Sequence, residues 1–388
     1  MFVIIPRMPG KIRTICPSFV LSGVCLLALA GEFVFAQPSG TSSKAASAVA
    51  HTEANAMPAV PGTRLPGQDG SQEGWAVTLS PLSPPAQTIS DLFYLILGIM
   101  VCIFLVVGTT MAVLVFRFRA GRNEPGGEPP QIYGSKPIEL AWTVGPAIIV
   151  FVLFLVTARS IFDIRSTTPP TEAIHVRVVG HQWWWEFQYL DHNVTTANEL
   201  HVPLSTDGTP RPVYLDLESA DVIHSFWVPQ LAGKTDLFPG RVNHMWFQPN
   251  RAGWFIGQCA EYCGTQHAHM WLRVKSESED EFQKWVAQQQ KSAVLDSAVS
   301  AGRDLFLSNA CANCHTIRGT HAKGIFGPDL THLMSRETIA SGIRLNNKEN
   351  LTQWVHDPQA IKDGCRMPDM KLTDDSTQKI VAYLLTLH

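Results

Sequence analysis

The chain has 388 residues, about two to three domains by usual domain size. Charged residues make up only 16% of it, below the roughly 25% typical of soluble proteins, so part of the chain is expected to lie in a membrane. The net charge of −3 gives no basic excess and argues against nucleic-acid binding. With 28 Gly and 26 Pro, the composition also excludes a fibrous or wholly disordered protein.

The N-terminus has the three parts of a secretory signal peptide. Basic residues precede an apolar run over 19–30, and small side chains occupy the cleavage positions that end at Ala36. A first membrane helix is the weaker interpretation because the apolar run is short. We therefore predict a signal peptide over 1–36. Residues 37–87 are rich in Ala, Ser, Pro and Gly without periodicity, which predicts a flexible exported linker.

The next part of the chain contains two uncharged apolar segments, 92–116 and 140–158, each long enough to cross about 30 Å of hydrocarbon. They predict a two-helix transmembrane hairpin over 88–168, with helices at about 91–116 and 139–161. The connection between them is positively charged, and positive loops stay in the cytoplasm. We therefore expect a multi-pass protein of the bacterial inner membrane, with the rest of the chain on the periplasmic or outer face. The positive residues are Arg117, Arg119, Arg122 and Lys136.

Residues 169–285 contain short β-rich runs separated by Gly, Pro, Asp and Asn. This spacing favours an all-β sandwich or barrel over a helical domain. The runs are Ile174–Val179, Val213–Leu217, Val222–Trp227, Val242–Phe247 and Trp254–Ile256.

The metal-binding residue types of this segment are concentrated at 259–270. Two Cys, a His and a Met form a soft ligand set that suits copper. His224, in the upstream sequence Asp-Val-Ile-His, is the best second imidazole. If both thiolates bridge, they hold two copper ions close together with one His on each. A disulfide or a zinc site are the alternatives. The four residues within 259–270 are Cys259, Cys263, His267 and Met270.

This segment resembles subunit II of the haem-copper cytochrome c oxidases. The family pattern is C-x-E-x-C-G-x-x-H-x-x-M with an upstream D-x-x-H, and every position matches. The resemblance covers about residues 75–285. It implies an all-β cupredoxin domain over 169–285 that holds a binuclear copper centre, CuA.

The resemblance implies a role for each ligand position. The two Cys bridge the coppers and the two His each cap one, while Met270 is a weak ligand and the Glu261 carbonyl is the last. The Glu261 side chain is expected to face subunit I and contribute to a magnesium site there. His269 and His244 match no ligand position and are interpreted as structural. The bridging and capping residues are Cys259, Cys263, His224 and His267.

Two further residues gain roles from the resemblance. Trp183 lies in an aromatic cluster over 181–187, which on sequence alone suits a core or an interface. In the family the first Trp of such a strand is where electrons enter, although a fused electron-delivering domain would leave Trp183 less exposed to outside partners. Glu139 precedes the second apolar segment, where a helix dipole favours a carboxylate. The resemblance implies instead the mouth of a proton-uptake channel into subunit I.

The C-terminal part carries a second motif, Cys311-Ala-Asn-Cys314-His315. Cys-x-x-Cys-His is the covalent attachment motif of haem c, in which the thiols add to the vinyl groups and the His ligates iron. A Cys-x-x-Cys pair alone also occurs in zinc and redox sites, but the following His and the export signal favour haem. We predict a linker over 286–297 and a cytochrome c domain over 298–388.

This domain is similar to the all-α class I cytochromes c. The similarity implies that Met367 is the axial ligand opposite His315, and that the Pro328 carbonyl accepts the Nδ1–H of His315. Thr373 is expected to open a last helix that ends near Leu387 with one apolar face. The other candidates for the axial ligand are Met334, Met370, His321, His332 and His356.

A subunit II with a fused cytochrome c is the arrangement of caa-type oxidases. It implies electron flow from a cytochrome c-type donor or an upstream bc complex to haem c, to CuA and to a separate subunit I, with subunit III as a further partner. The equivalent subunit of a nitric oxide reductase stays open, because the partner subunit does the chemistry. A quinol oxidase subunit lacks these copper ligands, and a copper-storage protein needs no haem. No disulfide is expected between Cys102 and Cys365, and Cys365 is predicted to be a free, half-buried thiol.

Overall fold

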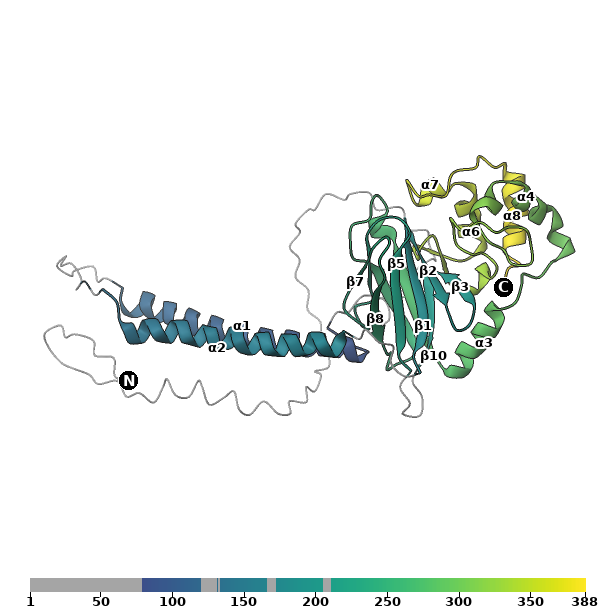
Figure 1. The fold of residues 1–388 in the computed structure, drawn as a ribbon. Helices are drawn as coiled ribbons and strands as arrows, with labels where there is room; N and C mark the ends of the chain where they lie inside the picture. Colours follow the sequence, from purple (N-terminus) through teal and green to yellow (C-terminus); the bar gives the residue numbers. More distant parts are fainter. Residues whose placement is uncertain (1–78, 120–130, 132, 166–171, 205–210) are drawn as a thin grey trace, which may run out of the picture. The chain divides into compact units, whose positions relative to one another are not determined.

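The computed structural model describes residues 79–119, 131, 133–165, 172–204 and 211–388. The predicted signal peptide and residues 37–78 of the predicted linker lie outside this part of the chain. The described elements are, in order, apolar helices, β-strands and C-terminal helices (Figure 1). This order is the one expected for a membrane hairpin, an all-β domain and a helical domain.

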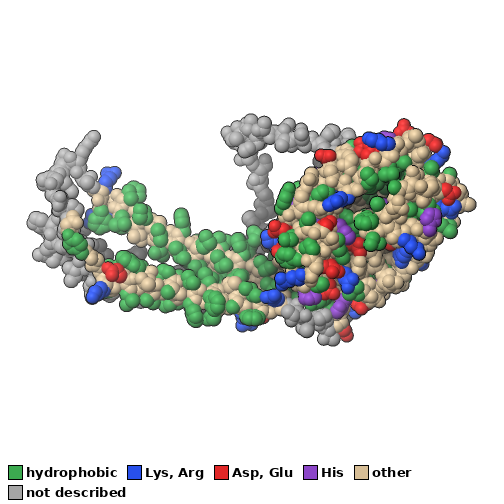
Figure 2. All heavy atoms as spheres, turned by 45° about the horizontal axis from the view of Figure 1, so that its top comes forward, with side chains coloured by type: hydrophobic (Ala, Val, Ile, Leu, Met, Phe, Trp, Pro, Cys, Tyr) green, Lys and Arg blue, Asp and Glu red, His purple; other side chains and the backbone are tan. Residues whose placement is uncertain are grey.

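Among the described residues, two helices are long and apolar enough to cross a membrane. They are α1 (Pro84–Arg117) and α2 (Lys136–Ile164), and they lie side by side. Apolar side chains cover their length, and charged side chains gather toward their ends (Figure 2). A helix that is apolar all round and not buried in a protein core is suited to contact with lipid.

Both helices extend beyond their predicted bounds of about 91–116 and 139–161. A proline occupies the first turn of each helix, where its fixed φ suits the helix and its missing N–H costs no hydrogen bond. Hydropathy marks only the part of a helix that lies in hydrocarbon. The hydrogen-bonded helix continues into polar residues on both sides, and the sequence pattern missed these ends.

The end of the predicted flexible linker is part of the folded structure, which corrects the boundary at 87. The Leu82 N–H donates to the Gln230 carbonyl at 2.8 Å, and the Asn250 N–H donates to the Leu82 carbonyl at 3.0 Å. Ser83 is buried, and its Oγ accepts from the Gln248 N–H at 2.9 Å. These bonds attach the start of α1 to the β domain.

The β domain contains two five-stranded sheets among its described residues, with orders β3-β2-β1-β5-β8 and β4-β10-β9-β6-β7. The pairing is antiparallel except for β1 with β5 and β4 with β10. The predicted β-runs coincide with β1, β5, β6, β8 and β9. The strands are β1 (Ile174–His181), β2 (Trp184–Tyr189), β3 (Val194–Ala197), β4 (Glu199–Pro203), β5 (Val213–Ser219), β6 (His224–Trp227), β7 (Thr235–Leu237), β8 (Asn243–Phe247), β9 (Gly253–Cys259) and β10 (Trp271–Glu277).

The core of this domain comes from one face of each sheet. Strand β1 alternates buried and more exposed positions, as expected for a strand with one face on a core. Large side chains that are fully buried in this core include Trp185, Phe187, Phe226 and Phe255. Strand β4 is buried along its whole length because helix α3 (Glu279–Gln289) also packs against it.

Helix α3 corrects the predicted linker over 286–297, because its last turn includes residues 286–289. Ser278 and Glu281 form a reciprocal capping box at its start. Phe282, Val286 and Gln289 recur at helical spacing and are buried, so the pattern of burial continues past 286. The sequence suggested a polar end there, but the Gln289 side chain donates to the Ser335 Oγ at 2.9 Å.

The C-terminal domain is helical, with one short pair of strands. Its last helix is N-capped by Thr373, and the predicted apolar face is confirmed as buried. Ile380, Tyr383 and Leu384 form that face, whereas the predicted helix end near Leu387 is too late because α8 ends at Leu384; Leu387 is buried beyond it. The elements are η4 (Ser297–Val299), α4 (Ser300–Ser308), α5 (Cys311–Cys314), η5 (Leu333–Ser335), β11 (Thr338–Ile339), β12 (Arg344–Leu345), α6 (Lys348–His356), α7 (Pro358–Ile361) and α8 (Asp374–Leu384).

Helices α4 and α8 cross so closely that only glycine fits at position 302. A Cβ added to Gly302 would lie 2.0 Å from the carbonyl oxygen of Lys379, which is backbone and cannot move aside. We expect Gly302→Ala to destabilise the domain by about 1–3 kcal/mol, the usual cost of overpacking. For a domain of this size that lowers the melting midpoint by roughly 4–8 °C per kcal/mol, measured from the haem absorption on heating. Ala301→Ser, at the exposed neighbouring position, is the control and should melt like the parent. Equal midpoints for both variants would contradict the close crossing.

Two buried charged side chains join the C-terminal domain to the β domain. Glu199 of β4 accepts from the N–H groups of Glu337 and Thr338 at 3.0 and 2.8 Å, and also from the Thr338 hydroxyl. Lys362 of the C-terminal domain donates to two carbonyls of the β domain, those of Trp183 and His269, at 2.8 and 2.9 Å. Burial lowers the pKa of Lys362, to about 7. Because buried polar groups need partners, these contacts satisfy the buried Glu199 carboxylate and Lys362 ammonium.

Candidate functional site

The soft ligand residues of the β domain lie together in the structure. Cys259 is the last residue of β9, and Cys263 lies in the loop that follows it. Their sulfur atoms are 3.8 Å apart, and both side chains are buried. The Cys263 sulfur also lies 3.6 Å from the His267 Nδ1 and 3.8 Å from the Met270 sulfur.

The other side of the cluster is completed by β6. His224 is the first residue of this strand, and its Nδ1 lies 3.9 Å from the Cys259 sulfur. The Glu261 carbonyl oxygen is 3.1 Å from the same sulfur. The ligand atoms of His224, Cys259 and Cys263 all lie within 4.8 Å of one another. The sequence motif predicted that these residues share one site, and in the structure they lie together.

These separations fit ligands that share metal ions. Two ligands at about 2.0–2.3 Å from one metal, in tetrahedral geometry, are about 3.3–3.8 Å apart. The sulfur–sulfur, sulfur–imidazole and sulfur–thioether distances of 3.8, 3.6 and 3.8 Å fall within this range. Two thiolates with two imidazoles and a thioether are a donor set that favours copper.

The electrostatics of the pair favour a thiolate. Contact with the Cys263 thiol and with His224 outweighs burial and lowers the pKa of Cys259, to about 3. The same contact and burial raise the pKa of Cys263. Contact with the second thiol and with His224 therefore favours a thiolate at Cys259. The anionic sulfur is the form that binds a soft metal ion.

The His224 ring is oriented by a carboxylate behind it. Its Nε2 lies 2.9 Å from the Asp221 Oδ1, which leaves Nδ1 turned toward the sulfur atoms. Burial opposes protonation of this ring, but contact with Asp221 and Cys259 raises its pKa overall. A carboxylate on the far nitrogen of a ligating His is a common way to fix the ring. Gly180 leaves room for it, because a Cβ there would lie 2.8 Å from the ring.

Trp183 lies between this cluster and the C-terminal domain. Its indole N–H donates to the Cys263 carbonyl at 3.0 Å, and its side chain is only 8% exposed. Its own carbonyl accepts from Lys362 and from the Ser341 hydroxyl. From the sequence we expect either an electron-entry surface at Trp183 or a Trp183 that a fused domain leaves little exposed. The structure matches the second expectation.

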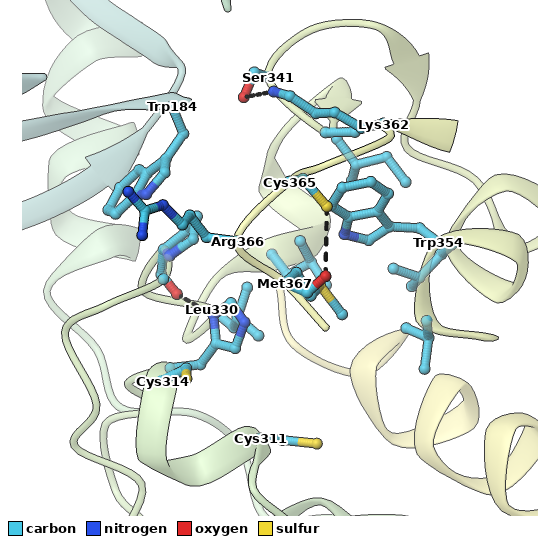
Figure 3. A pocket seen from close by; sticks show the side chains of 18 of the residues that line it. Trp184, Cys311, Cys314, Leu330, Ser341, Trp354, Lys362, Cys365, Arg366 and Met367 are labelled. Carbon is cyan, nitrogen blue, oxygen red and sulfur yellow. Dashed lines mark hydrogen bonds between the residues drawn. The ribbon is translucent and has the colours of Figure 1, made fainter. Parts of the chain in front are cut away.

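The second site is a cavity of about 220 Å³ in the C-terminal domain, which also reaches the β domain (Figure 3). Cys311 and Cys314 project from one short helix, and Met367 lies on a loop across the cavity. The walls are mostly apolar, which suits a large flat hydrophobic group. Apolar lining residues include Phe306, Leu333, Leu351, Ile380 and Leu384.

His315 lines the same cavity and is fixed by the chain. Its Nδ1 lies 2.8 Å from the Pro328 carbonyl oxygen, which leaves Nε2 free to face a ligand. Burial lowers the pKa of this ring, so it stays neutral, as ligation to iron requires. A Cβ on Gly327 would come within 2.5 Å of the ring, so this position also needs glycine. Two thiols, a neutral imidazole and a thioether around an apolar cavity fit a covalently bound haem.

The other predicted residues have various partners and positions. Glu139 is in the first turn of α2, where its carboxylate accepts from the Ser135 N–H at 3.2 Å. His269 bonds to the Gln266 side chain, and His244 bonds to Asp216. The Glu261 side chain is exposed next to the cluster. Cys102 and Cys365 are free thiols, and Cys365 is half-buried.

Comparison with known proteins gives three family matches along the chain. Residues 75–159 match the transmembrane domain of cytochrome c oxidase subunit II, residues 195–277 match its periplasmic domain, and residues 299–388 match cytochrome c. The cytochrome c oxidase subunit 2 of Alkalihalophilus pseudofirmus is 34% identical over 318 residues, which cover 80% of this chain and 90% of that protein. The chain belongs to the cytochrome c oxidase subunit II family.

A second relative agrees with this membership. The cytochrome c oxidase subunit 2 of Bacillus subtilis is 32% identical over 327 residues, which cover 79% of this chain and 90% of that protein. The solved periplasmic domain of subunit II of Bradyrhizobium japonicum cytochrome oxidase is 29% identical. The match covers 32% of this chain and 97% of that structure, with a TM-score of 0.30.

As a subunit II with a cytochrome c domain, the chain is a component of a membrane-bound oxidoreductase complex and a partner of subunit I. Copper and haem are its cofactors, and its role is to receive electrons for the oxidase.

Three residues near the sites escaped the sequence analysis as functional candidates. Trp184, treated there only as an aromatic, lines the haem cavity and stacks on His181 with ring centroids 4.2 Å apart. From the sequence, Lys362 would be expected at the surface, but its side chain is buried and donates to the Trp183 carbonyl. Arg366 also lines the cavity. No local pattern marks such residues, because their contacts cross between domains.

Proposed function

We propose that the chain takes electrons from a cytochrome c-type donor, or from an upstream bc complex, at its C-terminal domain. The electrons then pass to the cysteine cluster and on to subunit I, where O₂ is reduced to water. The observation that carries the proposal is the position of Trp183. This residue lines the cavity of the haem attachment motif and also donates to the carbonyl of Cys263.

The residues of the two sites support haem c and a binuclear copper centre as the resident groups. Cys311 and Cys314 would hold the haem, with His315 and Met367 on its iron. Cys259 and Cys263 would bridge the coppers, His224 and His267 would cap them, and Met270 and the Glu261 carbonyl would complete the set. When bound, these groups supply reversible one-electron chemistry.

The protein around the groups has separate tasks. Asp221 and Pro328 hold the two ligating rings in orientation, and the apolar walls keep water from the cavity. Thioether ligation by Met367 would favour a high haem potential, suited to a donor of high potential.

We also propose how the chain is oriented in the membrane and which residues face the other subunits. The positive residues Arg117, Arg119 and Lys136 support a cytoplasmic connection between α1 and α2 in the bacterial inner membrane. Both metal domains then lie on the periplasmic or outer face. The exposed Glu261 side chain would contribute to a magnesium site shared with subunit I, and Glu139 would begin proton uptake into that subunit. Subunit III is a further proposed partner.

The test of this function is gas consumption by the complex purified through this chain. With reduced cytochrome c as the donor, we expect rapid O₂ uptake that cyanide abolishes, with the haem of this chain reduced during turnover. Consumption of NO with little O₂ uptake would assign the chain to a nitric oxide reductase. Failure of reduced cytochrome c to reduce the haem, while an artificial donor succeeds, would contradict a cytochrome c-type donor and favour the bc complex.

A further inference from the structure

Arg366 lies between the two candidate cofactor sites. It precedes Met367 on the loop over residues 362–373, which we call the ligand loop. Its side chain lines the haem cavity, as Figure 3 shows. The guanidinium carbon is 6.0 Å from the centroid of the Trp183 ring, within the range of a cation–π contact. Its Nη2 donates a hydrogen bond to the Gln182 side-chain oxygen.

From Gln182 the contacts continue to the cysteine cluster. The Gln182 side-chain amide donates to the Cys263 carbonyl at 2.8 Å, and the Trp183 indole donates to the same oxygen at 3.0 Å. The peptide bond between Arg366 and Met367 joins this network to the haem cavity. A continuous path of covalent and hydrogen bonds therefore runs from Met367 to Cys263.

The ligand loop is fixed at its other end by Lys362. This side chain is 3% exposed, and it donates to the carbonyls of Trp183 and His269 and to the Ser341 hydroxyl at 2.8–2.9 Å. Trp183 is thus held at its backbone by Lys362 and contacted at its ring by Arg366. The loop that bears Met367 is therefore held at two points against the turn between β1 and β2, whose Gln182 and Trp183 side chains bond to Cys263.

We propose that Arg366 is a positioning residue for electron transfer from the haem cavity to the cysteine cluster. The inference rests on the proposed function. The step moves one electron from reduced haem iron, which is oxidised, to the oxidised copper pair, which is reduced. No bond forms or breaks, and no proton moves. Arg366 acts by keeping Gln182 and Trp183 in contact with the ligand loop.

An arginine suits this place better than a lysine. Its planar guanidinium lies over an aromatic ring while its N–H groups donate in the same plane, and it stays charged at all accessible pH values. A hydrogen bond from a charged donor is stronger than one between neutral groups, so this contact favours one position of the Gln182 side chain.

The experiment uses the complete purified complex and the variant Arg366→Met. A photoactivated ruthenium complex reduces the haem, and electron arrival is followed by the near-infrared absorption of the copper pair. The potentials of both groups are measured so that the change in driving force is known. At equal driving force we expect the transfer rate to fall about tenfold, which corresponds to about 1.4 kcal/mol of barrier. Lys371→Met is the matched control, because it removes an equal charge from the same loop at an exposed ion pair with Asp369. It should transfer at the parent rate.

Further variants separate positioning from a general loss of structure. Arg366→Lys keeps the charge but loses the planar guanidinium, and its electron transfer should also be slow. The double variant with Gln182→Leu should lose less than the product of the two single losses, because both variants break the Arg366–Gln182 contact. Parent rates in Arg366→Met, or independent and additive losses in the double variant, would overturn the inference. If haem and copper in the parent complex exchange no electron, the proposed function fails instead.

Discussion

Cys263→Ser is expected to abolish the near-infrared absorption of the copper pair and leave the haem fully reducible. The Cys263 sulfur is central to the cluster, within 3.6–3.8 Å of donor atoms of Cys259, His267 and Met270. A hydroxyl at this position is a harder and much less acidic ligand, so it cannot replace a bridging thiolate. Electron transfer from the chain to subunit I should then fall to background. The measurement is the absorption spectrum of the purified complex together with reduction of its haem by dithionite.

The control for this variant is Cys365→Ser. Cys365 is also a free, half-buried thiol, but it belongs to the ligand loop and not to the cluster. Its replacement should leave the copper absorption unchanged. Survival of the near-infrared band in Cys263→Ser would show that the two cysteines do not both ligate. Loss of the band in Cys365→Ser would place the copper elsewhere.

The sites could be predicted from the sequence where their residues are close along the chain. Cys259, Cys263, His267 and Met270 occur within the short segment 259–270, so their spacing alone indicates a metal site. Cys311, Cys314 and His315 do so as well. His224 came from the short Asp-x-x-His pattern, in which Asp221 turns the ring. The burial of the last helix followed from its periodicity, because one face of that helix packs on α4 and α6.

The contacts between the domains could not be predicted, because they join residues far apart along the chain. Lys362 is 179 residues from Trp183, and Arg366 is 184 residues from Gln182. A lysine among Asp, Gly and Cys looks like a surface residue until the fold buries it. The limits of the helices were missed for a related reason. Hydropathy and polarity indicate the environment of a segment. Where a helix begins and ends depends on capping residues such as Ser278 and on buried contacts such as those of Gln289.

Replacing Met367 by His is expected to lower the midpoint potential of the haem by on the order of 0.1 V, a fraction of the ≈ 0.8 V that axial ligands span. A thioether stabilises reduced iron more than a second imidazole does. The place of Met367 is defined, because its carbonyl accepts from the Gln359 side chain at 2.7 Å and from the Cys365 thiol. A redox titration of the purified complex measures the change.

The control for this prediction is Met370→Leu, because Met370 also lines the cavity. If Met367 is the ligand, the potential in Met370→Leu stays near that of the parent. A large fall in that variant, with none in Met367→His, would assign the ligand to Met370. The direction of the change also bears on the electron path. A lower haem potential makes transfer to the copper more downhill and reduction by a high-potential donor less favourable. With Met367→His, O₂ uptake should therefore become limited by the external donor, while transfer within the chain continues.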